Sequence, residues 1–239
     1  YWILKALKID EHLNETKAII DDLDELGLIL WTLGKYSQAE KAALKELKVS
    51  RQAKLKVQIA ESYKHLGLIY RDWNRFDKSK QMFLRSLKIS MQLGNKKRTA
   101  KICRCLGELY KDNEKLDQAQ QMYLKALGID RKLGNQRGVA RDYQGLGDVY
   151  LFKRKPEKAK QMYRESLKID LKLKKKQNVA DDYFNLGLVY FFEERLVLAE
   201  KQICRAMAID KQSDDRKGVA VEYDVLGQIY REKQEYKKA

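Results

Sequence analysis

Apolar residues recur along the chain at mixed three- and four-residue spacings, the pattern of a helix with one buried face. In the segment 139–169, Leu146, Gly147 and Tyr150 are followed by the small residue Ala159. The Leu-Gly pair of this segment recurs every 40 residues, as Leu26-Gly27, Leu66-Gly67, Leu106-Gly107, Leu146-Gly147, Leu186-Gly187 and Leu226-Gly227. A fixed period of roughly 20 to 50 residues indicates a solenoid of stacked units. Because the only periodicity is helical, the sequence predicts an all-α chain.

Each repeat is expected to hold two antiparallel helices of about 17 residues, roughly 25 Å long. First helices are predicted at 16–33, 57–73, 97–113, 137–153, 177–193 and 217–233. Second helices are predicted at 1–13, 37–53, 77–93, 117–133, 157–173 and 197–212. Asn14 is expected to end the first of these, and Ser37 with Glu40 has the spacing of a capping box.

The period divides the chain into one solenoid, residues 1–239. Its parts are a half repeat 1–16, the repeats 17–56, 57–96, 97–136, 137–176 and 177–216, and a partial repeat 217–239. Because the chain begins in the middle of a repeat and stops where another helix is due, we expect it to be a fragment of a longer protein.

The repeated glycine needs a packing explanation, since glycine in a helix interior costs about 1 kcal/mol relative to alanine. We expect a neighbouring helix to approach so closely at this point that no Cβ would fit. A second tight contact is predicted twelve residues later, at Ala39, Ser79, Ala119, Ala159 and Ala199. The tyrosines four residues before and three after the glycines are then mainly wedges between helices.

Each unit resembles the tetratricopeptide repeat. The shared pattern is a large residue, then Leu-Gly, then Tyr, then a small residue at the start of a second helix, an aromatic residue and another small residue. The resemblance covers the whole chain and implies a right-handed superhelical α-solenoid of antiparallel helix pairs. The family's usual unit has 34 residues and closes with a proline, whereas this chain has the 40-residue period of long-helix variants. The family's chaperone clamp is not expected, because Leu68 and Cys105 stand where it has Asn.

The composition narrows the class of partner. Charged residues make up 35% of the chain, and the net charge of +16 suits nucleic acid, an anionic membrane surface or an acidic protein. No apolar run approaches the roughly 20 residues of a membrane span. The odd number of cysteines, Cys103, Cys105 and Cys204, argues against a disulfide framework and favours a reducing compartment, the cytoplasm.

No catalytic constellation is visible in the sequence. The two histidines, His12 and His65, have no zinc-ligand spacing, and no phosphate-binding glycine loop occurs. We therefore expect neither catalysis nor a metal or cofactor, and binding is the remaining class of function.

The resemblance implies that first helices line a concave groove. An apolar group is expected on the groove wall of the fourth and fifth repeats, at Leu151, Phe152, Phe184, Leu188, Phe191 and Phe192. A basic group is expected beside it, at Lys64, Arg71, Lys101, Arg104, Lys111 and Arg141. Together they predict a scaffold or sensor that binds a protein or peptide segment, acidic and with a hydrophobic anchor.

Several alternatives remain open. One alternative is that a neighbouring repeat or another part of the parent protein covers the apolar group. A second is that the module regulates an enzyme domain outside this chain. The basic turns between repeats, such as Lys96, Lys97 and Arg98, form an edge suited to nucleic acid, although no interleaved aromatics support this. The acidic cluster around Asp21 and Glu25 allows head-to-tail self-association, a solvated face being the simpler explanation.

Overall fold

The structure, a computed structural model, describes residues 2–13 and 15–233, without the side chains of Leu4 and Glu11. Every regular element within these residues is an α-helix. The helices are α1 (Trp2–Leu13), α2 (Thr16–Thr32), α3 (Tyr36–Gln52), α4 (Lys56–Asp72), α5 (Phe76–Gln92), α6 (Lys96–Asp112), α7 (Leu116–Lys132), α8 (Gln136–Phe152), α9 (Pro156–Lys172), α10 (Lys176–Phe192), α11 (Leu196–Gln212) and α12 (Arg216–Glu232). The all-α repeat fold is confirmed. Asn14 and the end of the partial repeat, 234–239, lie outside the described residues.

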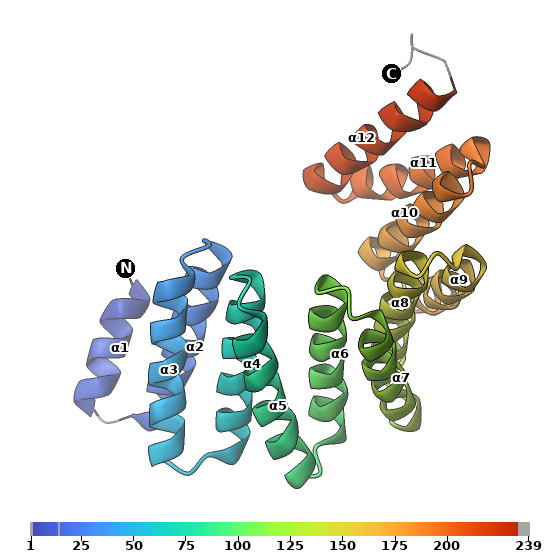
Figure 1. Cartoon of the computed structure of the whole chain (residues 1–239). Coiled ribbons are helices and arrows are strands. Elements are labelled where there is room, and N and C mark those ends of the chain that lie inside the picture. Colours follow the sequence, from blue (N-terminus) through green and yellow to red (C-terminus); the bar gives the residue numbers. More distant parts are fainter. Residues whose placement is uncertain (1, 14, 234–239) are drawn as a thin grey trace. The chain divides into compact units, whose positions relative to one another are not determined.

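The helices belong to two compact units, unit 1 (Tyr1–Lys115) and unit 2 (Leu116–Ala239). Within each unit, a helix packs chiefly on the helices before and after it in the chain, as α3 packs on α2 and α4, and α10 on α9 and α11 (Figure 1). This is the arrangement of a repeat protein, in which each helix pair buries its apolar face on its neighbours rather than in one central core.

Each helix from α2 to α11 ends in the same tight turn, one residue of which has a positive φ. Glycine occupies this place at Gly34, Gly94 and Gly134, where φ is +63° to +70°. In the first of these turns the N–H of Lys35 bonds to the carbonyl of Leu30, closing the helix as glycine C-caps commonly do.

Helix starts are only partly as expected. The predicted capping box is wrong, because α3 begins at Tyr36 and has no side-chain cap. Glu40 instead accepts a hydrogen bond from the Tyr70 hydroxyl on α4. The side chains of Asn95 and Asn135 do cap α6 and α8.

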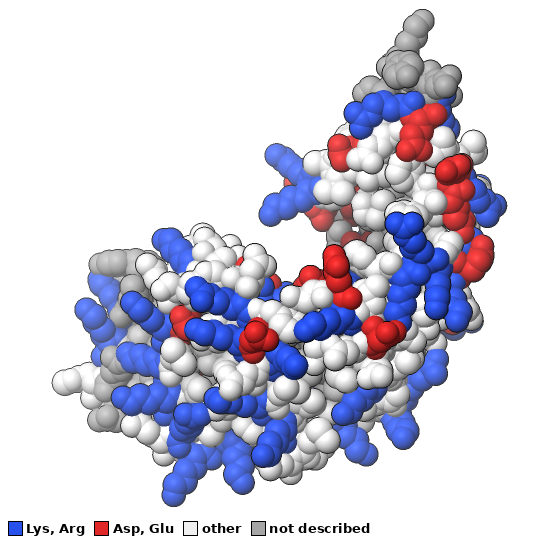
Figure 2. Space-filling view, in the orientation of Figure 1, with Lys and Arg blue, Asp and Glu red and all other residues white. Residues whose placement is uncertain are grey.

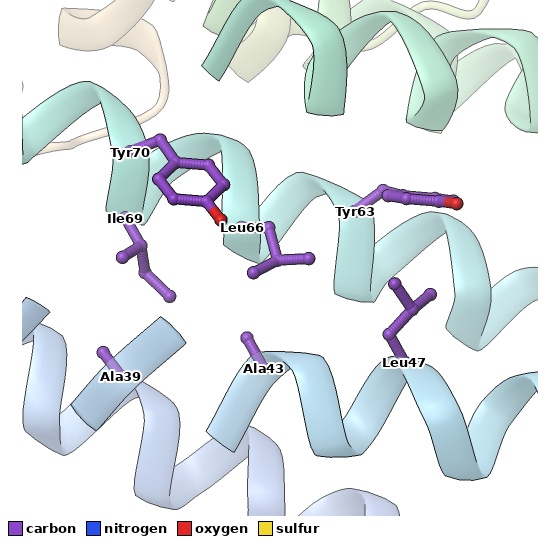
Figure 3. Close-up of a cluster of buried hydrophobic side chains, with 7 residues drawn as sticks. All are labelled: Ala39, Ala43, Leu47, Tyr63, Leu66, Ile69 and Tyr70. Atoms are coloured by element: carbon purple, nitrogen blue, oxygen red, sulfur yellow. The ribbon is translucent and has the colours of Figure 1, made fainter. Parts of the chain in front are cut away.

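The cores confirm the predicted role of the small residues. Ala39, Ala43 and Leu47 on α3 face four residues of α4, and all seven are buried (Figure 3). The small residues Ser79, Ala119, Ala159 and Ala199 are also fully buried. Ser79 makes a polar contact as well, since its Oγ donates to the carbonyl of Gly67 at 2.7 Å.

The Leu-Gly account holds for three of the glycines. A Cβ on Gly67 would lie 2.5 Å from the ring of Phe83, and one on Gly147 would lie 2.6 Å from the ring of Tyr163. A Cβ on Gly187 would lie 2.5 Å from the side chain of Ile203. Each partner stands sixteen residues after its glycine. A Cβ on Gly27 would be 3.8 Å from Ala42, an ordinary contact, and a Cβ on Gly227 would meet nothing within 4 Å. Close approach therefore does not explain these two glycines.

Candidate partner-binding surface

Two exposed phenylalanines lie at the same position of consecutive repeats. Phe152 ends α8 and Phe192 ends α10, and their exposed fractions are 62% and 64%. The corresponding positions of the other repeats hold Thr32, Asp72, Asp112 and Glu232. An aromatic side chain replaces a polar one only in these two repeats. We call Phe152 and Phe192 the aromatic surface.

The remaining members of the predicted apolar group are partly buried. Phe184, Leu188 and Phe191 pack against a core cluster that includes Tyr190, Ile203 and residues of α12. Leu151 packs against the cluster of Ala159, Tyr163, Leu186 and Val189. These four side chains thus contribute to packing between successive helices of unit 2.

Two members of the predicted basic group have acidic partners. Lys64 is only 5% exposed, and its ammonium pairs with Glu61. Although burial raises the pKa of the Glu61 carboxyl, Lys64 and Arg98 together hold it down at about 2. Arg71 pairs with Asp72 and Glu108, and these carboxylates outweigh burial and raise the pKa of its guanidinium.

The other four basic residues differ in exposure. Lys101 in unit 1 and Arg141 in unit 2 are exposed, whereas Arg104 and Lys111 are partly buried. Partial burial and the nearby ammonium of Lys64 lower the pKa of Lys101. The predicted basic group is therefore divided between the two units and between exposed and enclosed positions.

A hydrogen-bonded chain crosses the equivalent surface of unit 1. The indole N–H of Trp31 on α2 donates to Asp72 on α4 at 2.8 Å. Asp72 accepts from Arg71 at 2.9 Å, and Arg71 continues to Glu108 on α6. The first helices of unit 1 thus satisfy one another's polar groups where unit 2 exposes phenylalanine.

Unit 1 also contains a cavity of about 220 Å³. Its lining includes Trp31, Ala43, Glu46, Lys64, His65 and Lys101. Ala43 lies sixteen residues after Gly27, where the other glycines face a large side chain such as Phe83. The small side chain leaves space that the next repeat fills with an aromatic ring.

Basic residues also gather at the turns between repeats. In unit 1, the turns from α3 to α4 and from α5 to α6 lie on the same side (Figure 1), and Lys and Arg side chains project from that side (Figure 2). Lys54, Lys56, Lys96 and Lys97 are all exposed there. Arg98 is instead paired with Glu61.

The repeat architecture agrees with a comparison of the sequence with protein-family models. The family model described as Tetratricopeptide repeat matches residues 20–92 and 98–172, more than half of the chain. The chain belongs to the tetratricopeptide repeat family. No curated protein matches its sequence.

Solved structures share the fold of this tetratricopeptide repeat chain at low sequence identity. BtubC (BKLC) from P. vanneervenii is 23% identical, with a TM-score of 0.75 over 89% of this chain and 88% of that one. The apo form of RapI is 18% identical, with a TM-score of 0.77 over 88% and 77%. Aspartyl phosphate phosphatase F from Bacillus subtilis is 12% identical, with a TM-score of 0.78 over 97% and 70%.

Membership of this family assigns the general mode of action. Tetratricopeptide repeats are generally non-catalytic modules that bind protein partners, and this chain has the repeats of a protein-interaction scaffold. Within the described residues, no helix is long and apolar enough to cross a bilayer.

Sequence reasoning missed one group of residues in unit 1. Asp24, Glu46 and His65 come from three helices, yet their side chains converge on one point of the cavity. Their separations of 22 and 19 residues match no ligand motif, so no sequence pattern could have indicated the convergence.

Proposed function

We propose that this scaffold binds a segment of a partner protein on unit 2, with the aromatic surface as its hydrophobic anchor. The observation that carries the proposal is the pair of phenylalanines, each more than 60% exposed, at matching positions of consecutive repeats. Exposed aromatic rings with this regular spacing suit a helical or extended segment that crosses successive first helices.

Energetics support a binding role for the two rings. Fully burying a phenylalanine side chain contributes about 1.5 to 3 kcal/mol, so leaving two exposed forgoes a gain that folding could have used. The partly buried Phe184, Leu188 and Phe191 pack in the core beside them, so the repeat has a filled interior without Phe152 and Phe192. A partner that covers both rings would recover the forgone energy.

Within unit 2, a charge contact is proposed at the exposed cation Arg141. Lys101, Arg104 and Lys111 belong to unit 1 and are proposed as a separate set of charge contacts for an acidic partner. Lys64 and Arg71 already have carboxylate partners within unit 1, so an acidic ligand would have to displace those partners. The net charge of +16 favours a partner segment that carries acidic residues. We also propose a reducing compartment, the cytoplasm, and the three free cysteines, two of them buried, support this.

The test is affinity capture from a lysate of the source with wild type and the double variant Phe152→Ser/Phe192→Ser, both treated with nuclease. A partner held by the aromatic surface is expected with wild type and lost with the variant. The captured partner is then bound as a purified protein, and its affinity is expected to fall at least tenfold with the variant, because two anchors are removed.

A matched control separates the aromatic surface from general surface hydrophobicity. Leu124 on α7 and Leu171 on α9 are exposed apolar residues on second helices of the same unit, with exposed fractions of 47% and 51%. Leu124→Ser/Leu171→Ser is expected to keep the partner. Equal loss with both double variants would contradict the proposal, and capture that survives Phe152→Ser/Phe192→Ser but disappears with nuclease would favour the basic turns and nucleic acid.

A further inference from the structure

Three polar side chains from successive helices meet in the cavity of unit 1. Asp24 lies on α2, Glu46 on α3 and His65 on α4. Nδ1 of His65 is 2.8 Å from Oδ1 of Asp24 and 3.5 Å from Oε2 of Glu46, and one ligand atom from each residue lies within 4.8 Å of the others. Two carboxylates thus point at a single imidazole nitrogen.

Comparison of the repeats shows that an acid at the position of Glu46 is exceptional. Glu46 is 2% exposed, whereas the matching positions in the other repeats hold Ser86, Ala126, Ser166 and Ala206. The position of His65 is occupied elsewhere by Cys105, Gly145, Asn185 and Val225. Since the fold is built four times without these groups, packing does not require them. A buried carboxylate is costly unless it is paired, so its presence needs a compensating partner.

Protein groups compensate this carboxylate only in part. The hydroxyl of Ser62 donates to Oε1 of Glu46 at 2.8 Å and so fixes the orientation of the carboxylate. Neither Oε2 of Glu46 nor Nδ1 of His65, both buried, has a hydrogen-bond partner of normal geometry. Moreover, Nδ1 carries at most one hydrogen, which cannot serve two carboxylates fully.

We propose that unit 1 binds a divalent transition-metal ion of the zinc class through Asp24, Glu46 and His65. Zinc binds imidazole nitrogen at about 2.0 to 2.1 Å and carboxylate oxygen at about 2.0 to 2.2 Å, which places tetrahedral ligand atoms about 3.3 to 3.6 Å apart. The two separations from Nδ1 of His65, 2.8 and 3.5 Å, need adjustments of up to about half an ångström, and the ligand oxygens of Asp24 and Glu46 lie within 4.8 Å of one another. The imidazole ligand favours zinc over magnesium or calcium, which prefer oxygen.

The charge of the site fits a divalent cation. In the metal-bound form, in which the imidazole has lost its proton, the imidazole and the two carboxylates carry two negative charges, which one divalent ion balances. The nearby ammonium of Lys64 is paired with Glu61, a carboxylate that it shares with Arg98. With three protein ligands, a fourth coordination position remains for water in the cavity that Ala43 leaves open.

The test is titration of the untagged chain with Co²⁺, followed by displacement with Zn²⁺. Tetrahedral Co²⁺ gives visible absorption bands, and isothermal calorimetry measures the Zn²⁺ stoichiometry and affinity. All proteins carry Cys204→Ser, because Cys204 is an exposed thiol. We expect one equivalent of bound metal, with Mg²⁺ in excess failing to displace it.

Three ligand replacements, Asp24→Asn, Glu46→Gln and His65→Gln, are each expected to weaken binding at least tenfold. Asp24→Asn is the most informative, since the Asp24 side chain is 50% exposed and its replacement leaves the core intact. Its matched control is Asp21→Asn, an exposed aspartate on the same helix, and His12→Gln removes the other histidine.

Both controls are expected to bind like wild type. The proposal is overturned by the absence of saturable binding, by equal affinity of Asp24→Asn and Asp21→Asn, or by loss of the metal with His12→Gln. These outcomes do not depend on the aromatic surface of unit 2, so the metal site and the proposed partner site are tested separately.

Discussion

Replacement of Gly147 by alanine tests how the repeat packs. An added Cβ would lie 2.6 to 2.8 Å from three ring carbons of Tyr163, closer than real Cβ contacts allow. The ring has little freedom to retreat, because Tyr163 is 1% exposed and its hydroxyl donates to Asp148 at 2.7 Å. Overpacking of this kind costs about 1 to 3 kcal/mol. Alanine also gains about 1 kcal/mol of helix propensity over glycine, so the expected net loss is about 0 to 2 kcal/mol.

The same replacement at Gly227 supplies the control. Gly227 has the same place in its repeat and the same preceding leucine, but an added Cβ would meet nothing within 4 Å. Gly227→Ala is therefore expected to stabilise α12 by up to about 1 kcal/mol. Because the propensity gain is common to both variants, the difference between them, about 1 to 3 kcal/mol, measures the steric contact of Gly147 with Tyr163.

Native-state hydrogen exchange is the suitable assay, because repeat proteins open locally and a single melting curve would average over the units. Protection of α8 and α9 is expected to fall in Gly147→Ala, whereas protection of α12 is expected to rise in Gly227→Ala. If both variants shift protection in the same direction and by the same amount, the close approach does not explain the glycine, and the packing argument is refuted.

Four further replacements probe other contacts. Phe191→Ala is expected to lower the free energy of unfolding by about 1 to 3 kcal/mol, whereas Phe192→Ala should change it by less than about 0.5 kcal/mol; urea unfolding distinguishes them. Asp182→Asn is expected to remove the part of the pH dependence of stability that comes from this carboxyl. Burial raises the Asp182 pKa to about 7, so the native state holds a proton that the unfolded state releases near pH 4, and stability falls as pH rises through this window. Unfolding midpoints at pH 4 to 8 should show a flatter profile in the variant. Trp31→Phe removes the hydrogen bond to Asp72 and should cost about 0.5 to 1.5 kcal/mol by thermal unfolding.

The helices could be predicted almost completely from the sequence because their signal is repeated. Predicted bounds such as 57–73 and 97–113 differ from α4 and α6 by one residue. A wrong local inference was corrected only by the structure: Ser37 and Glu40 have the capping-box spacing, but Glu40 lies opposite Tyr70 and bonds to its hydroxyl. A spacing of three residues does not say which tertiary partner competes for the side chain.

The candidate sites were less predictable, since they depend on which face of a helix meets a neighbour. Phe191 and Phe192 are adjacent in sequence, but a step of one residue turns a helix by about 100°. One ring therefore packs in the core while the other is exposed. Basic character alone likewise did not separate Lys64, which is buried against Glu61, from the exposed Lys101.

A repeat protein offers an internal standard for locating function, because one chain solves the same packing problem several times. At the position of Glu46 the other repeats use serine or alanine, and at the positions of Phe152 and Phe192 they use polar residues. Each departure carries a free-energy cost that the fold itself does not require, either a buried charge or an exposed ring. The stacking of repeats neither requires these residues nor offsets their cost in free energy. The positions of Glu46, Phe152 and Phe192 are therefore where a binding function is most directly tested. The two departures fall in different units and have opposite chemistry, so one chain is expected to offer two independent ligand sites.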